Sequence, residues 1–127
     1  MFRHAKKLCP TAIVIPKHLR EPGGRAVLAE LQKCEFEVLA LAAAGMHTHF
    51  LAELLEDRPE TKAIVGRCKT AACYAIQEEM PGKVWARDGK YAPVNDREHQ
   101  VNTYYYIERQ SNAWIWTFRH PEGRYSD

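Results

Sequence analysis

The chain lacks any long hydrophobic run, and this absence excludes a membrane-spanning helix. Its best apolar stretch, residues 38–45, has the length of a strand, whereas a helical span needs ~20 apolar residues. Pro10 and Pro16 interrupt the apolar stretch behind the early basic residues, so the N-terminus does not resemble a secretory signal. We therefore expect a cytoplasmic protein with no membrane partner.

Closely spaced cysteine pairs are also missing. The pattern excludes the two-residue spacing that is typical of structural zinc sites, and we expect buried, reduced thiols instead. The cysteines are Cys9, Cys34, Cys68 and Cys73. Repeats, low-complexity tracts and an obvious linker are absent too, so the 127 residues predict one compact domain over 1–127.

Neither sign of charge is in large excess, because the net charge is only +2, but the charged residues are unevenly distributed. Residues 1–25 carry six basic side chains against one acidic side chain, a net charge of +5. Residues 26–60 carry seven acidic side chains against two basic ones. The basic segment suits contact with phosphates only if other residues handle phosphate chemistry.

The periodicity of apolar residues and the positions of glycine and proline predict an alternation of strands and helices. The first six elements follow a ferredoxin-like βαββαβ order, an α+β fold with an antiparallel sheet and helices on one face. We also predict an additional C-terminal helix that carries a tyrosine. The second face of the sheet is either covered by this helix or left free. We predict strands over 11–16, 36–43, 47–55, 83–86 and 113–118, helices over 25–33, 57–79 and 95–110, turns at 21–24 and 81–82, and a loose tail over 119–127.

The first candidate site is the pair His47 and His49. Side chains two residues apart on a strand point to the same face, so both imidazoles project together and can share one divalent metal. Thr48 points to the opposite face, with Phe50 and Ala52, which we expect to face the core. Two unrelated surface histidines would give the same short pattern.

The second candidate site lies on the predicted helix over 95–110. Tyr106 and Gln110 are four residues apart, so their side chains share one helix face, which continues backward through Asn102 and His99. A tyrosine among polar groups is available for chemistry, although packing with a bonded hydroxyl is the commoner role. The more core-like stripe consists of Val101, Tyr104 and Tyr105.

These segments together resemble the single-tyrosine transposases of the histidine–hydrophobe–histidine (HUH) class, including those associated with repetitive extragenic palindromes. Residues 45–51, GMHTHFL, resemble the family's metal-binding strand. Residues 101–110, VNTYYYIERQ, resemble its helix, in which glutamine follows the tyrosine by four positions. Residues 83–94 resemble the tryptophan-containing strand and loop before that helix, and the resemblance covers roughly 38–110 in the expected order.

The resemblance implies that Tyr106 is the nucleophile and that His47, His49 and Gln110 bind the metal. The middle residue of the triplet is Thr48, where the family usually has a large hydrophobic residue. Tyr104 and Tyr105 stay open as alternative nucleophiles, and only Tyr106 has the four-residue spacing to Gln110.

The implied activity is metal-dependent cleavage and rejoining of single-stranded DNA near hairpins, through a 5′-phosphotyrosine. Two imidazoles with an amide oxygen favour Mg²⁺ or Mn²⁺ at a phosphoryl-transfer site, although zinc or nickel would also be accepted. Relatives occur as monomers and as homodimers, and the sequence leaves this choice open. Candidate phosphate contacts are Lys6, Lys7, Lys17, Arg20, Arg67 and Lys69. Trp85, Tyr91 and Trp114 could stack on unpaired bases, although Trp85 and Trp114 lie in strand-like runs, where a core position is the commoner role.

Two other functions remain open at this stage. A non-catalytic, domesticated relative would bind DNA or RNA hairpins without metal chemistry. A metal-dependent phosphohydrolase would instead use His47, His49 and either Glu53 or His99 to activate water. That enzyme would form no covalent protein–DNA species.

Overall fold

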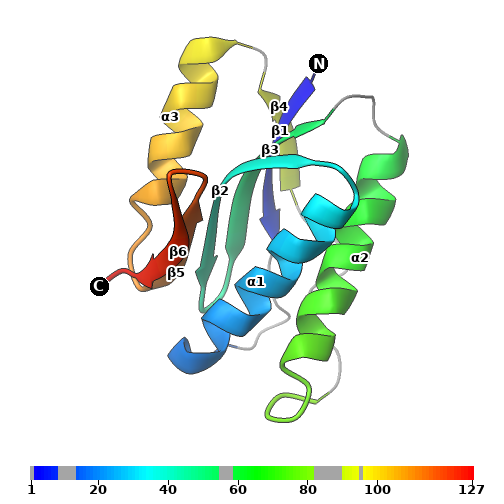
Figure 1. The fold of residues 1–127 in the computed structure, drawn as a ribbon, viewed down its shortest axis with the longest axis vertical. Coiled ribbons are helices and arrows are strands. Elements are labelled where there is room, and N and C mark those ends of the chain that lie inside the picture. The colour runs from blue at the N-terminus through cyan, green and yellow to red at the C-terminus, as the bar shows by residue number, and fades with distance from the viewer. Residues whose placement is uncertain (1, 9–13, 55–58, 82–89, 95) are drawn as a thin grey trace.

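The computed structural model describes the backbone of residues 2–8, 14–54, 59–81, 90–94 and 96–127, and the side chains of 14–53, 63–81, 94 and 96–127. Figure 1 shows one sheet with helices α1 and α2 lying side by side and α3 standing apart from them. The elements are β1 (Phe2–Leu8), α1 (Lys17–Lys33), β2 (Glu37–Ala44), β3 (Thr48–Leu54), α2 (Pro59–Ala75), β4 (Lys90–Val94), α3 (Arg97–Glu108), β5 (Ala113–Thr117) and β6 (His120–Tyr125).

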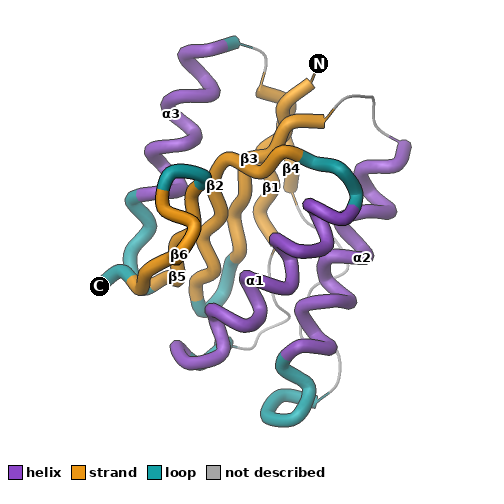
Figure 2. Tube along the Cα trace, viewed as in Figure 1, coloured by secondary structure: helices purple, strands orange, loops and turns teal. Residues whose placement is uncertain are grey.

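The sheet has the strand order β4-β1-β3-β2-β5-β6, and every neighbouring pair is antiparallel. Its first four strands have the order of a ferredoxin-like βαββαβ unit, so the predicted α+β class and element order are confirmed. Beyond them, β5 and β6 extend the sheet past β2, as the strand colours in Figure 2 show. The helix predicted over 95–110 is α3, and two strands follow it.

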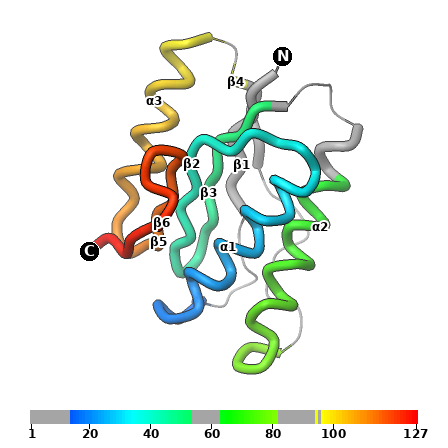
Figure 3. The backbone as a smooth tube through the Cα atoms, viewed as in Figure 1, coloured from blue at the N-terminus to red at the C-terminus, as the bar shows by residue number. Residues whose placement is uncertain are grey.

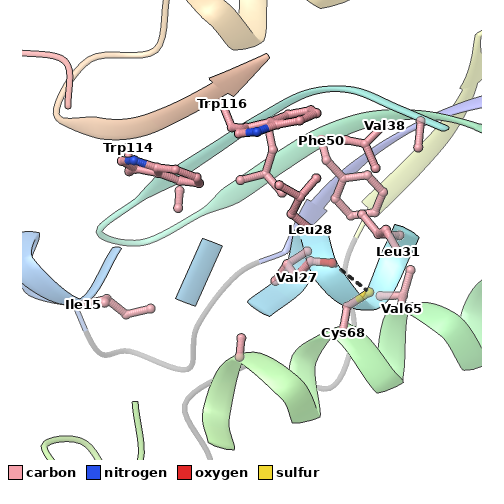
Figure 4. Close-up of a cluster of buried hydrophobic side chains, with 14 of the residues drawn as sticks. Ile15, Val27, Leu28, Leu31, Val38, Phe50, Val65, Cys68, Trp114 and Trp116 are labelled. Atoms are coloured by element: carbon pink, nitrogen blue, oxygen red, sulfur yellow. Dashed lines mark hydrogen bonds between the residues drawn. The ribbon is translucent and has the colours of Figure 1, made fainter. Parts of the chain in front are cut away.

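The larger core lies between the sheet and the pair α1 and α2 (Figure 4). Phe50 and Ala52 of β3 belong to this core, as the alternation predicted. Cys68 of α2 is fully buried in it, and its thiol donates to the Val27 carbonyl at 3.9 Å. Burial raises the pKa of this thiol to about 12, so Cys68 stays protonated and unreactive.

A smaller core lies on the opposite face of the sheet, beneath α3. Ile107 is the buried anchor of α3, and small side chains on β2 and β5 let the helix come close to the strands. The members of this core include Ala40, Ala42, Leu51, Val94, Ile107, Ala113 and Ile115. Of the two possibilities left open for this face, coverage by the extra helix is the observed one.

The strand predicted over 11–16 is wrong where the structure describes it. Residues 14–16 form no strand, residues 11–13 lie outside the described residues, and the first strand is Phe2–Leu8. Ile15 is buried in the larger core, and its amide donates to the Gly45 carbonyl at 2.8 Å. The apolar side chain of Ile15 thus occupies a core position just before α1 without being part of a strand.

The turn predicted at 21–24 is also wrong, because these residues lie inside α1. Pro22 costs the helix one backbone hydrogen bond near its start. Gly24 lets α1 approach the sheet closely. A Cβ on Gly24 would lie 2.9 Å from Cε3 of Trp114 and 3.1 Å from the Cβ of Ala43. Tertiary packing therefore overrides the local turn signal.

This close approach gives a stability prediction. Gly24→Ala forces an overpacked contact with Trp114 and should lower the free energy of unfolding by about 1–3 kcal/mol. Gly66 on α2 is the matched control, because a Cβ there meets no atom within 4 Å. Gly66→Ala should raise stability by up to about 1 kcal/mol through helix propensity. Urea denaturation of both variants is the measurement, and equal effects would contradict close packing at Gly24.

The tail predicted to be loose instead forms β6, which pairs with β5. Gly123 has φ +73°, and a Cβ there would lie 2.4 Å from Cζ2 of Trp114. The glycine therefore allows the strand to close against the tryptophan. Figure 3 shows the red C-terminal hairpin beside the orange end of α3. The strand predicted over 83–86 lies outside the described residues.

Other expectations concern cysteines and membranes. Cys34, Cys68 and Cys73 are free thiols, of which only Cys68 is fully buried. Burial raises the pKa of Cys34 as well. Within the described part of the chain, no helix combines the length and the apolar character needed to cross a membrane.

Candidate functional site

The two predicted histidines lie at the start of β3, on the face of the sheet that α3 covers. His47 directly precedes the strand, and His49 is its second residue. Their ring centroids are 6.0 Å apart, with the planes at 75°. Thr48 between them is 2% exposed and points to the other face, so the predicted same-face arrangement of the histidines is observed.

Tyr106 of α3 stands beside this pair. Its ring centroid lies 5.7 Å from that of His49, with the planes at 72°. The Tyr106 side chain is 59% exposed, which leaves it accessible to a substrate. The structure thus brings together residues that are far apart in the chain, on a strand and on a separate helix.

The orientation of α3 follows from its cap and its anchor. Asp96 caps the helix by accepting a hydrogen bond from the His99 amide at 2.7 Å. Ile107, 1% exposed, holds the helix to the sheet and leaves the adjacent Tyr106 at the edge of the interface. The helix predicted over 95–110 therefore begins at Arg97, and Asn95 lies outside the described residues.

Gln110 lies two residues beyond the end of α3, one helical turn after Tyr106. Its side-chain nitrogen donates to the Tyr106 carbonyl at 3.1 Å, so its amide oxygen is the atom left for a ligand. Ser126 holds this turn from the C-terminal segment, because its hydroxyl donates to the Gln110 carbonyl at 2.7 Å. The residue that directly follows β6 thus holds the backbone of Gln110.

The donors that could hold a divalent cation here are the imidazoles of His47 and His49 and the amide oxygen of Gln110. Among the described residues, no three His, Cys, Asp or Glu side chains cluster to hold a metal. A site here would therefore need an oxygen donor such as Gln110 beside His47 and His49.

Arg20 links the segment just before α1 to the segment that follows Gln110. Its guanidinium donates to the carbonyls of Ile15 at 2.9 Å and Asn112 at 2.7 Å. A Cβ on Gly45, in the turn before His47, would lie 2.8 Å from the same guanidinium. The structure therefore gives Arg20 a bracing role, and a phosphate contact by this residue stays a prediction.

The other predicted phosphate contacts lie on different elements, α1, α2 and β1. Arg67 pairs with Glu30 on the α1 and α2 layer, at 3.2 Å. Lys17 begins α1, and its ammonium lies 5.5 Å from the centre of the Tyr125 ring. Lys69 lies on α2. Of the β1 lysines, whose side chains lie outside the described residues, Lys7 is in register with His49 and Lys6 with Phe50.

The aromatic residues available for stacking differ from those predicted. Trp114 is 1% exposed, so of its two possible roles the core position is the observed one and stacking on bases is not. Trp85 and the side chain of Tyr91 lie outside the described residues. Sequence analysis instead missed Tyr105, 40% exposed, and Phe118, 51% exposed. The core-like stripe predicted from Val101, Tyr104 and Tyr105 is wrong for its exposed members, and the buried position is Ile107.

Comparison with known proteins supports the fold. A solved structure of a REP-associated tyrosine transposase bound to a REP hairpin matches with a TM-score of 0.63 and 13% sequence identity. The match covers 84% of this chain and 62% of that chain, so this chain spans less than two thirds of its length. No protein-family model and no curated protein sequence matches the chain.

Proposed function

We propose that the protein is a metal-dependent nuclease and strand transferase for single-stranded DNA next to hairpins, with Tyr106 as its nucleophile. The observation that carries this proposal is the 5.7 Å approach of the exposed Tyr106 ring to His49, itself beside His47. The fold shared with a hairpin-bound tyrosine transposase supports the same chemistry. DNA hairpins are therefore the partner to test first.

In this proposal one residue is the nucleophile and three others hold the metal ion. Tyr106 presents its hydroxyl from a rigid helix that Ile107 anchors, so attack on phosphorus needs little rearrangement. His47, His49 and the Gln110 amide oxygen would hold a Mg²⁺ or Mn²⁺ ion. When bound, the ion neutralises charge on the scissile phosphate. The Ser126 hydroxyl holds the backbone of Gln110 by donating a hydrogen bond to the Gln110 carbonyl.

The reaction is a transesterification. The Tyr106 oxygen forms a bond to phosphorus while the bond from phosphorus to the 3′ oxygen breaks. The phenol gives up one proton and the leaving 3′ oxygen takes up one, so no net proton is consumed. The resulting 5′-phosphotyrosine preserves one phosphodiester, and attack by another 3′-hydroxyl rejoins DNA without an external energy source.

A covalent-trapping assay tests this function. Labelled hairpin DNA with single-stranded flanks is incubated with the protein and Mn²⁺, and the products are separated on a denaturing gel. The proposal predicts a labelled band at the mass of a protein–DNA adduct, which EDTA prevents. Hairpin binding with no adduct over a broad pool of hairpins would favour the non-catalytic binder, and cleavage without an adduct would favour the phosphohydrolase.

A further inference from the structure

A groove runs between α3 and the turn that joins β5 to β6, on a different flank of α3 from Tyr106. Its volume is about 180 Å³, less than the ~300 Å³ at which pockets for drug-sized ligands begin. A space of this size suits a planar ring. We call it the α3 groove and define it by Arg97, Val101, Tyr104, Tyr105, Phe118 and Arg119.

Three rings in contact form the wall of the α3 groove. The Tyr104 ring lies 5.4 Å from that of Tyr105 and 5.9 Å from that of Phe118, both edge to face. Tyr104 packs against the smaller core, whereas Tyr105 and Phe118 are 40% and 51% exposed. The wall thus consists of the Tyr104 ring, which packs on the core, with the exposed rings of Tyr105 and Phe118 on either side of it.

Positive charge accompanies these rings. Arg97 and Arg119 line the groove, whose described lining includes no carboxylate. Arg119 lies 5.5 Å from the centre of the Phe118 ring, and Arg109 lies 5.3 Å from that of Tyr105. Within the described residues, neither Arg97 nor Arg119 forms an ion pair.

We propose that the α3 groove binds unpaired bases of a single DNA strand, stacked on Tyr105 and Phe118, with the arginines contacting the backbone phosphates. Proteins bind single strands through such a combination of aromatic faces and cations. A second copy of the chain fits less well, because two copies would bring arginines against arginines. Tyr105 and Tyr106 are adjacent residues on different flanks of α3, so the proposal has the strand that Tyr106 attacks pass around this helix to reach the groove.

This inference rests on the proposed function for its substrate, and binding alone can test it. Fluorescence anisotropy would compare a labelled hairpin bearing a single-stranded flank with the same hairpin made blunt. All proteins would carry Tyr106→Phe and be measured in EDTA, so that no cleavage intervenes. The test variant is Tyr105→Ala with Phe118→Ala, and the matched control is Tyr74→Ala, an exposed tyrosine on α2.

We expect the double variant to lose about tenfold or more in affinity for the flanked hairpin. Its affinity for the blunt hairpin and the affinity of the Tyr74→Ala control should not change. Tyr105→Phe with Phe118→Trp keeps both rings and should keep the affinity. Arg119→Gln should lower the dependence of log affinity on log salt by about 0.7, the value for one phosphate of a single strand.

Three results would overturn the inference: unchanged affinity for the flanked hairpin, equal losses for both hairpins, or a wild-type dimer that the double variant converts to monomer. The last would make the groove an interface between copies. An adduct in the trapping assay with an insensitive groove would overturn this inference alone. Ring-dependent binding of the flank with no adduct would overturn the proposed catalysis alone.

Discussion

Tyr106→Phe is expected to abolish the covalent protein–DNA product while the protein stays folded. The substitution removes only the attacking oxygen, so the loss should be on the order of 10³-fold or more. The side chain is 59% exposed, and its ring contact with His49 does not need the hydroxyl. Thermal unfolding and hairpin affinity should therefore match those of the wild type.

Tyr104→Phe and Tyr105→Phe are the matched controls, because they remove the same atom from the two preceding residues. Both should retain the covalent product, since Tyr104 packs on the smaller core and Tyr105 lines the α3 groove. Retention of the product by Tyr106→Phe, with loss in either control, would assign the nucleophile to that neighbour.

His49→Ala is expected to lower the yield of covalent product about a hundredfold or more, because it removes a ligand from the proposed ion. Calorimetric titration with Mn²⁺ should show weaker binding in the same variant. His99→Ala is the control, since His99 is exposed in the first turn of α3, nearly two helical turns before Tyr106. It should retain both metal binding and product.

The opposite pattern would support a different enzyme. If His99→Ala lost activity while Tyr106→Phe kept it, water activation by a phosphohydrolase would replace transesterification. If His49→Ala kept full activity and Mn²⁺ affinity, the ion would have to bind elsewhere. Either result can be obtained from the same set of purified variants.

Much of the fold was predictable because it depends on periodicity. Alternation along 47–55 placed Phe50 and Ala52 in the core and the histidines on the other face, which the structure confirms. The four-residue spacing of Tyr106 and Gln110 predicted two side chains on one helix face; α3 ends at Glu108, and the structure shows the Gln110 side chain bonded to the Tyr106 backbone carbonyl. Local geometry decides both features.

The errors arose where distant residues decide the local structure. Pro22, Gly23 and Gly24 carry a strong turn signal, but α1 contains them because a small side chain is needed against Trp114. The polar sequence of 120–125 gives no strand pattern, yet β5 supplies the pairing edge. Neither contact can be read from a local window of sequence.

The site shows the same division. The sequence identified His47, His49 and Tyr106 as separate patterns, and only the fold brings the Tyr106 ring to 5.7 Å from His49. It did not identify Tyr105 and Phe118 as exposed, because apolar periodicity assigns aromatic residues to the core by default. Trp114, for which a core position was the commoner expected role, packs against Gly24 of α1 and Gly123 of β6.

Mass spectrometry of the trapped adduct tests the role of Tyr106 most directly. After nuclease and trypsin digestion, the peptide spanning 98–109 contains Tyr104, Tyr105 and Tyr106, and fragmentation locates the remaining nucleotide. We predict a nucleotide attached through a 5′ phosphate to Tyr106. A nucleotide on Tyr104 or Tyr105, or cleaved DNA with this peptide unmodified, would contradict Tyr106 as the nucleophile.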